Sequence, residues 1–394
     1  MGRQFNWLWA AFAVSAYGSG LGFGAFPLIA VLVLHEGPAA VSALSAVAPA
    51  VGALIAVPLG PWVEFRRKRP VMIGTDLVRF AVLLSIPIAY ALGVLSYVHL
   101  VGVALVMAAG KIAFNAAAGA YLKAVVRPDG LLAANARFES TTWSSLAVGP
   151  PLGGAAIGVL GPVTTVVADA VSYGLSALCL GGASGPEERP ERTGRRTHDV
   201  RAGWRFLLEH PALRALFLNN LLVNGLIMAT EPLLAVLLLG ELGFPPWQYG
   251  LAFAAPCVGG LIGSRLARPV VARFGRRWVL RVVGTLRVVP LVGLAFVRPG
   301  VTGLVTVIVV ELAIIVGMSL YQPVLATYRL EQTPTDRLAR VLTAWSISSS
   351  ASIAALSALG GVLAAITGPR IAIAVAGVLV LGTPVLLRRG RRIR

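Results

Sequence analysis

Runs of about 20 or more mostly apolar residues recur along this 394-residue chain, and each is long enough to cross the hydrocarbon of a bilayer as a helix. Only 13% of the residues are charged, against roughly 25% in a soluble domain. We therefore predict an all-α membrane protein with twelve transmembrane helices. The expected spans are 7–34, 40–61, 71–96, 99–126, 139–159, 163–183, 212–240, 246–267, 278–297, 301–327, 341–366 and 370–387.

One long polar segment, 184–203, divides six expected spans from six. A short amphipathic stretch, Trp204 to His210, follows it and is expected to lie along the membrane surface. The predicted organisation is a six-helix bundle (1–183), a cytoplasmic linker with a short amphipathic helix (184–211), a second six-helix bundle (212–387) and a basic cytoplasmic tail (388–394).

The net charge of +18 would suggest a nucleic-acid partner in a soluble protein. Here the basic residues stand in short clusters between apolar runs. Of the 34 lysines and arginines, 29 fall at the termini or in connections after even-numbered spans, and only Arg298 and Arg370 fall in the opposite connections. Because basic loops stay on the cytoplasmic side, we expect a multi-pass protein of a bacterial cytoplasmic (inner) membrane, with both termini cytoplasmic and no bound nucleic acid.

The two halves of the chain repeat each other. The stretch 121–154 matches 328–361 at a constant offset of 207 residues, and the same offset pairs Gly110 with Gly317. A half-chain repeat joined by a polar linker is typical of secondary transporters. The repeat also fails at particular places, because Lys111 falls opposite Met318 and Pro150 falls opposite Ser357.

The loop after the second expected span reads GPWVEFRRKR from Gly60 to Arg69. It resembles the G-x-x-x-D-R-x-G-R-R loop motif of the major facilitator superfamily, with Glu64 in place of the acid, Phe65 in place of the first arginine and Arg67 in place of the glycine. In the fifth expected span, the residues GPPLGG from Gly149 to Gly154 resemble the GPxxGG core of that superfamily's antiporter motif. The flanking sequence is similar to twelve-span drug and siderophore exporters of the macrolide-efflux and enterobactin-exporter type.

The resemblance implies two six-helix bundles with pseudo-two-fold symmetry and a drug:proton antiporter. It also implies a latch in which an acid near arginines holds a neighbouring helix end. The candidate latch residues are Gly60, Glu64, Arg66, Arg69 and Arg79, with Arg273, Gly275 and Arg276 in the second half. The alternative is that these arginines only set topology. The antiporter-motif residues are Gly149, Pro150, Gly153 and Gly154, whose alternative role is ordinary small-residue packing.

Ionisable side chains within expected spans are costly to bury and are candidates for function. Glu231, Glu311 and Asp76 are the candidate proton carriers. Lys111 is expected near the midplane of the fourth span, and Glu311 near that of the tenth. A static pair of Lys111 with either glutamate, fixing helix packing, is the alternative. Asp76 and Arg79 stand three residues apart and either join the Glu64 latch or form a local pair.

Polar residues share helix faces with these groups by spacings of three, four or seven. The resemblance implies that the first, fourth, seventh and tenth spans line a central cavity. The candidate cavity residues are Lys111, Asn115, Asn220, Asn224, Tyr17, Phe23, Tyr321 and Gln322. For the three aromatic residues, packing or lipid contact is the alternative.

The sequence shows no nucleotide-binding loop, catalytic triad or metal-ligand spacing. We therefore expect a transporter rather than an enzyme, with no cofactor and no metal, that runs on a proton gradient. The expected function is efflux of a small amphipathic compound (a drug, a siderophore or a secondary metabolite) by alternating access. We expect a monomer whose partners are its small-molecule substrate and membrane lipid. An importer on the same fold and a non-transporting membrane receptor or assembly factor remain alternatives.

Overall fold

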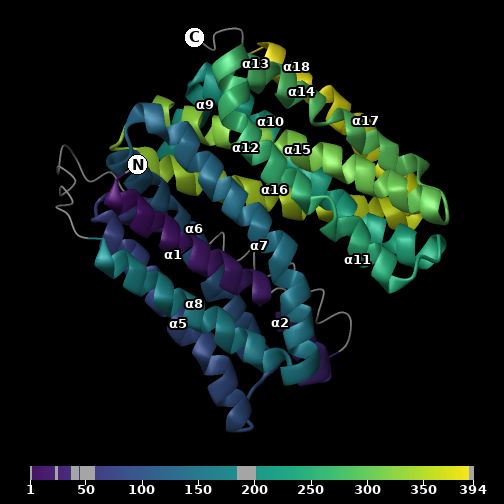
Figure 1. Ribbon diagram of the computed structural model, residues 1–394, viewed down its shortest axis with the longest axis horizontal. Coiled ribbons are helices and arrows are strands. Elements are labelled where there is room, and N and C mark those ends of the chain that lie inside the picture. The colour runs from purple at the N-terminus through teal and green to yellow at the C-terminus, as the bar shows by residue number, and fades with distance from the viewer. Residues whose placement is uncertain (1, 23–24, 37–43, 45–57, 184–200, 390–394) are drawn as a thin grey trace. The chain divides into compact units, whose positions relative to one another are not determined.

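The computed structural model describes residues 2–22, 25–36, 44, 58–183 and 201–389 (Figure 1). Every regular element in these ranges is a helix. Eleven helices in the described part are long and apolar enough to cross a membrane, and they overlap eleven of the expected spans. The other expected span, 40–61, lies mostly outside the described residues. The predicted all-α membrane class is confirmed.

The helices of the first half run from the N-terminus to the last described residue before the linker. They are α1 (Arg3–Leu21), α2 (Ala25–Leu32), α4 (Leu59–Glu64), α5 (Lys68–Ala91), α6 (Tyr97–Val125), η1 (Pro128–Gly130), α7 (Leu131–Leu160) and α8 (Pro162–Gly182). The predicted short helix of the linker is present as α9 (Ala202–Glu209), and its Trp204 packs against Ile112 and Ile347.

The second half contains more irregular helix than the first. Its elements are α10 (Pro211–Ala235), η2 (Val236–Glu241), α11 (Pro246–Ala254), α12 (Cys257–Phe274), α13 (Arg276–Trp278), η3 (Val279–Val283), α14 (Gly284–Leu286), η4 (Val289–Phe296), α15 (Val301–Gln332), α16 (Leu338–Thr367), α17 (Pro369–Gly382) and α18 (Pro384–Arg389). The ninth span changes from α-helix to π-helix at η3 and to 3-10 helix at η4. Pro290 contributes to this break because it has no N–H to donate to the preceding turn.

The internal repeat extends to the helix boundaries. α7 and α16 begin and end at positions that differ by 207 residues, as in the sequence repeat. Each is followed by a glycine with positive φ, Gly161 at 81° and Gly368 at 87°, and then by a proline that begins the next helix. Glycine tolerates this conformation and proline suits the first helical position, so the same turn is encoded twice.

The chain forms two compact units, which do not coincide with the predicted halves. Unit 1 comprises Met1–Leu131, Val148–Phe206 and Thr333–Ile347. Unit 2 comprises Leu132–Ala147, Leu207–Gln332 and Ser348–Arg394. Helices α7 and α16 therefore each contribute residues to both units. The division into two repeated six-helix halves remains a prediction about the sequence repeat.

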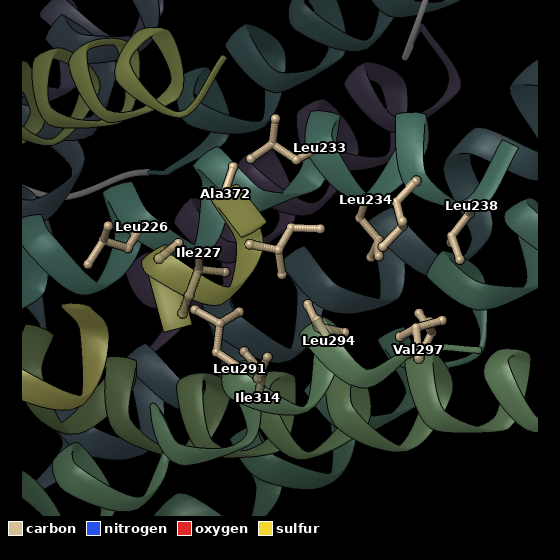
Figure 2. Packing of buried hydrophobic residues seen from close by; sticks show 14 of the residues in the cluster. Leu226, Ile227, Leu233, Leu234, Leu238, Leu291, Leu294, Val297, Ile314 and Ala372 are labelled. Atoms are coloured by element: carbon tan, nitrogen blue, oxygen red, sulfur yellow. The ribbon is translucent and has the colours of Figure 1, made fainter. Parts of the chain in front are cut away.

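Within unit 1, α8 packs along α1 and α5, and α6 packs against α5 (Figure 1). Within unit 2, α10, η4, α15 and α17 bury leucine, isoleucine and valine side chains against one another (Figure 2). α12 approaches α15 closely through Gly259, where a Cβ would lie 2.9 Å from Leu312. Small residues permit this close approach of two helices. These contacts hold the polar side chains described below.

Candidate functional site

The acid of the loop motif forms an ion pair with a residue far along the chain. Glu64, at the end of α4, accepts two hydrogen bonds of 2.5 Å from the Nε and Nη2 atoms of Arg340 in the first turn of α16. The side chains of Glu64 and Arg340 are only 7% and 11% exposed. Bidentate pairs of this kind are strong and specific in geometry. Within unit 1, Glu64 thus joins α4 to α16.

The arginines of the same loop have different contacts. The guanidinium of Arg66 lies 5.1 Å from the ring centre of Trp62. Arg69 donates to the backbone carbonyls of Leu180, at 2.6 Å, and Gly181. Basic side chains near a helix C-terminus satisfy carbonyls that have no intrahelical partner. Arg69 therefore fastens the end of α8. Gly60 lies within α4.

The corresponding loop of the second half is built on Gly275, which ends α12 with φ at 83°. Arg276 forms an ion pair with Glu331 near the end of α15. Arg273 lies over the ring of Phe274 at 5.5 Å. Arg276, Phe274 and Glu331 border a cavity of about 450 Å³ in unit 2. The loop therefore connects the ends of α12, α13 and α15.

Two glycines of the antiporter motif lie directly against the backbone of α1. A Cβ at Gly149 would lie 2.6 Å from the carbonyl carbon of Gly20, and a Cβ at Gly153 would collide with the carbonyl oxygen of Leu21. A Cβ at Gly154, in contrast, would have no neighbouring atom within 4 Å. Pro150 lies inside α7. Glycine is therefore needed at 149 and 153 for contact with α1, and 154 has no such constraint.

Asp76 and Arg79 form a pair inside unit 1. The Nη2 atom of Arg79 lies 2.9 Å from Oδ1 of Asp76, and neither side chain is more than 6% exposed. Ser176 of α8 donates to Oδ2 of Asp76 at 2.6 Å. Arg79 also lies 4.4 Å from the ring centre of Tyr173 and 5.1 Å from that of Phe114. Arg79 therefore belongs to a buried cluster between α5, α6 and α8, separate from the Glu64–Arg340 pair.

A second carboxylate joins this cluster through α1. Asp169 of α8 accepts a 3.1 Å hydrogen bond from the hydroxyl of Ser19, which lies 2.8 Å from the Tyr173 hydroxyl. Asp169 is 7% exposed and Tyr173 is 5% exposed. We call Ser19, Asp76, Arg79, Asp169, Tyr173 and Ser176 the unit 1 polar network. The site residues predicted from the sequence did not include Asp169, Ser19, Tyr173 or Ser176.

Lys111 and Asn115 lie on one exposed face of α6, four residues apart, while Ile112, Ala113 and Phe114 between them are buried. The predicted alignment of the two polar side chains is therefore present. Tyr17 of α1 is 39% exposed. Phe23 lies outside the described residues.

In unit 2, the candidate proton carriers Glu231 and Glu311 lie near each other. Glu231 is exposed on α10 and Glu311 is partly buried on α15. The charge of Glu231 acts on Glu311, and both act on Cys257 of α12. Two carboxylates from different spans therefore share one electrostatic environment.

The predicted polar residues of α10 and α15 also meet. The side-chain amide of Gln322 donates to Oδ1 of Asn220 at 3.3 Å. Asn220 is 2% exposed, and Asn224, one turn further along α10, is partly buried. Asn220 and Gln322 thus form a cross-link between two spans within unit 2.

Arg287 is the largest fully buried side chain of the described residues. Its guanidinium lies 3.7 Å from the ring centre of Tyr321 and donates to Oδ1 of Asn219 at 2.9 Å. A third contact goes to the sulfur of Met318 at 3.3 Å. Tyr321, predicted to line a cavity, is instead completely buried and stacks on this arginine.

The sites of Arg79 and Arg287 share two features of the internal repeat, while the arginines themselves are 208 residues apart, one more than the repeat offset. Each arginine lies against a glycine of the next span, Gly110 or Gly317, and under an aromatic ring four residues later, Phe114 or Tyr321. These glycines and rings are 207 residues apart. The two sites differ in charge, because only Arg79 has a carboxylate beside it among the described ion pairs.

Other residues of these clusters were missed from the sequence. Arg340 and Arg287 are not among the site residues predicted from the sequence. Glu139 was not considered, although it lies in α7 and accepts a 2.9 Å hydrogen bond from the indole of Trp143. Arg287 and Glu139 could have been selected because they are ionisable residues within expected spans. No local sequence pattern indicates that Glu64 pairs with Arg340.

Apolar spanning helices that hold buried carboxylates, arginines and amides define a multi-pass membrane protein of the transporter class. The sequence profile of the Major Facilitator Superfamily matches residues 8–233 and 217–393. This chain belongs to the Major Facilitator Superfamily, and the resemblance found in its sequence is confirmed.

The chain is similar to the multidrug efflux pump Tap of Mycolicibacterium fortuitum, with 30% identity over 308 residues that cover 74% of this chain and 73% of that protein. It is also similar to the MFS-type transporter YvqJ of Bacillus subtilis (strain 168), with 26% identity over 287 residues, 70% of this chain and 67% of that protein. Its fold is similar to the crystal structure of a bacterial homologue of the iron transporter ferroportin in an outward-facing state, with a TM-score of 0.84, 16% identity and coverage of 99% and 100%. The chain therefore has the fold of the superfamily's transporters, and these relatives are transporters rather than enzymes.

Proposed function

We propose that this protein is a secondary active transporter that exports a small amphipathic compound in exchange for protons. The observation that carries this proposal is the pair of carboxylates Glu231 and Glu311, which lie on two apolar helices of unit 2, α10 and α15. Two carboxylates whose charges interact disfavour simultaneous ionisation. Such a pair takes up and releases a proton as its solvation changes, which is what coupling to a proton gradient requires.

Export is favoured by two further observations. The relatives named Tap are multidrug efflux pumps. The glycines of the antiporter motif, Gly149 and Gly153, are pressed against α1, so this motif forms a tight contact between two spans. Import on the same fold is the alternative direction.

An amphipathic substrate is favoured by the polar residues on otherwise apolar helices. Lys111 and Asn115 present a polar strip on α6, and Asn224 and Glu231 lie on α10. Pockets that combine apolar walls with a few placed polar groups suit such molecules. Alternating access of two helical bundles is the mechanism that the internal repeat suggests.

We further propose that the protein works as a monomer in the bacterial cytoplasmic membrane with both termini in the cytoplasm. This orientation follows from the distribution of lysine and arginine between connections. The proton gradient is its energy source, and no cofactor is required. A membrane receptor or assembly factor that reuses the fold would have no need of the carboxylates of Glu231 and Glu311.

The proposal is tested by expressing the chain in a bacterial host whose own drug pumps are deleted, and by deleting the gene in its source. Drug tolerance and the ratio of extracellular to intracellular metabolites are then compared. We expect at least one amphipathic compound to accumulate outside cells that express the protein and inside cells that lack it. Unchanged distribution of every compound, with the protein folded in the membrane, would favour the receptor alternative.

A further inference from the structure

The unit 1 polar network contains a carboxylate without a cation of its own. Arg79 is hydrogen-bonded to Asp76, whereas Asp169 is held by the Ser19 hydroxyl and no ion pair among the described residues includes it. Burying an ionised carboxylate with only neutral donors is costly. Asp169 is therefore suited to exchange a proton.

We propose that Asp169 is a second proton-binding residue of this protein, and that Ser19 transmits its protonation to the contact between α1 and the antiporter-motif glycines of α7. The proposal deepens the proposed function and rests on it in taking protons as the coupling ion. It differs in location, since Glu231 and Glu311 belong to unit 2.

The hydrogen bonds around Ser19 have two arrangements. An ionised Asp169 only accepts, so Ser19 donates to it and accepts from the Tyr173 hydroxyl. A protonated Asp169 can donate to Ser19, which then turns its own hydrogen toward the Tyr173 oxygen. The observed distances, 3.1 Å to Asp169 and 2.8 Å to Tyr173, fit both arrangements. Proton binding at Asp169 thus reverses the donor-to-acceptor direction of the hydrogen bonds that link Asp169, Ser19 and Tyr173.

The last turn of α1 and the Gly22 that follows it, residues 18–22, lie between these hydrogen bonds and α7. On one side, a Cβ at Gly22 would lie 3.3 Å from Oδ2 of Asp169. On the other side, Gly20 and Leu21 touch Gly149 and Gly153 of α7. The same backbone segment touches Asp169 on one side and α7 on the other, and the interior of a protein is close-packed. A shift of this turn toward or away from Asp169 therefore changes its contact with α7.

The charged and titratable groups around Asp169 are few. α8 packs against α1, α2 and α5. α5 contributes Asp76 and Arg79, and α8 itself contributes Tyr173. α2 has no titratable residue, and the membrane part of α1 has only Tyr17. The charge of Arg79 acts both on Asp169 and on Lys111 of α6. Asp169 is therefore the group in this network whose charge is left without a directly bonded cation.

The test is hydrogen–deuterium exchange of the purified full chain in lipid nanodiscs at acidic and alkaline pH, corrected for intrinsic exchange rates. In the wild type, we expect peptides covering 12–22 and 145–156 to change their protection with pH by at least about fivefold, the lower range of coupling between sites. In Asp169→Asn, both peptides should show the acidic pattern at every pH. Asp129, an exposed carboxylate in η1, gives the matched control Asp129→Asn, which should respond as the wild type does.

Ser19→Ala separates transmission from proton binding. It should keep the fold but abolish the pH response of peptide 145–156, while Ser15→Ala, which removes a local hydroxyl on the same helix, should preserve it. Double substitution of Glu231 and Glu311 by glutamine should leave both responses unchanged, so that failure of this proposal and failure of the unit 2 assignment are distinct. A wild type without pH response, or Asp169→Asn and Ser19→Ala proteins that respond as the wild type does, would overturn the proposal.

Discussion

The contact between α7 and α1 gives the sharpest prediction for a single substitution. Gly149 and Gly154 lie in the same helix, but only Gly149 is buried against another backbone. Replacing either by alanine adds one methyl group and gains about 1 kcal/mol of helix propensity. The difference between Gly149→Ala and Gly154→Ala therefore isolates the effect of steric overlap.

The size of that effect follows from the distances. A Cβ at 149 would lie 2.6 Å from both the carbonyl carbon and the Cα of Gly20, whereas carbon atoms pack at about 3.5–4.0 Å. Backbone atoms cannot rotate away, so the helices must separate. Overpacking of this kind costs about 1–3 kcal/mol, which corresponds to roughly 2–4 °C in Tm for each kcal/mol in a chain of 150 to 250 residues and less in a larger one.

The measurement is thermal unfolding of the purified protein in detergent, followed by tryptophan fluorescence. We expect Gly149→Ala to unfold at a lower temperature than Gly154→Ala, and Gly154→Ala to match or exceed the wild type. Equal unfolding temperatures for the two variants would show that α7 does not touch α1 as described, and the antiporter motif would then have no packing role at this contact.

Two other substitutions test buried charges. Glu64→Gln should destabilise the protein by about 3–5 kcal/mol because it removes the negative charge that compensates the largely buried guanidinium of Arg340. A double-mutant cycle with Arg340→Met should show that the two losses are not additive. Arg287→Lys should lower stability by about 1–3 kcal/mol, since an ammonium group cannot both stack on Tyr321 and reach Asn219. The exposed Arg281→Lys is its control, and unfolding temperatures equal to the wild type would contradict either assignment.

The positions of the spans could be predicted from the sequence because hydropathy is a local property. The expected span 99–126 and α6, Tyr97–Val125, differ by two residues at the start. The repeat predicted from an offset of 207 residues proved to include helix boundaries and the turns at Gly161 and Gly368. Local spacing also indicated the Asp76–Arg79 pair, three residues apart.

The contacts between distant segments could not be predicted in this way. Glu64 and Arg340 are 276 residues apart, and Ser19 and Asp169 are 150 residues apart, so neither pairing follows from helix periodicity. Different parts of α7 and of α16 belong to different units, and this division depends on packing rather than on composition. The repeat nevertheless helps in retrospect, because the repeat-related Gly110 and Gly317 lie against the buried Arg79 and Arg287.

Coupling of transport to protons through Glu231 and Glu311 is tested most directly in proteoliposomes. A pH gradient is imposed, and movement of ethidium and of protons is followed by ethidium and pyranine fluorescence. We expect gradient-driven ethidium movement with proton counterflow in the wild type and in Asp129→Asn, and loss of both in Glu231→Gln and Glu311→Gln. Proton-driven transport that persists at the wild-type rate in both glutamine variants would contradict the coupling role of these two carboxylates.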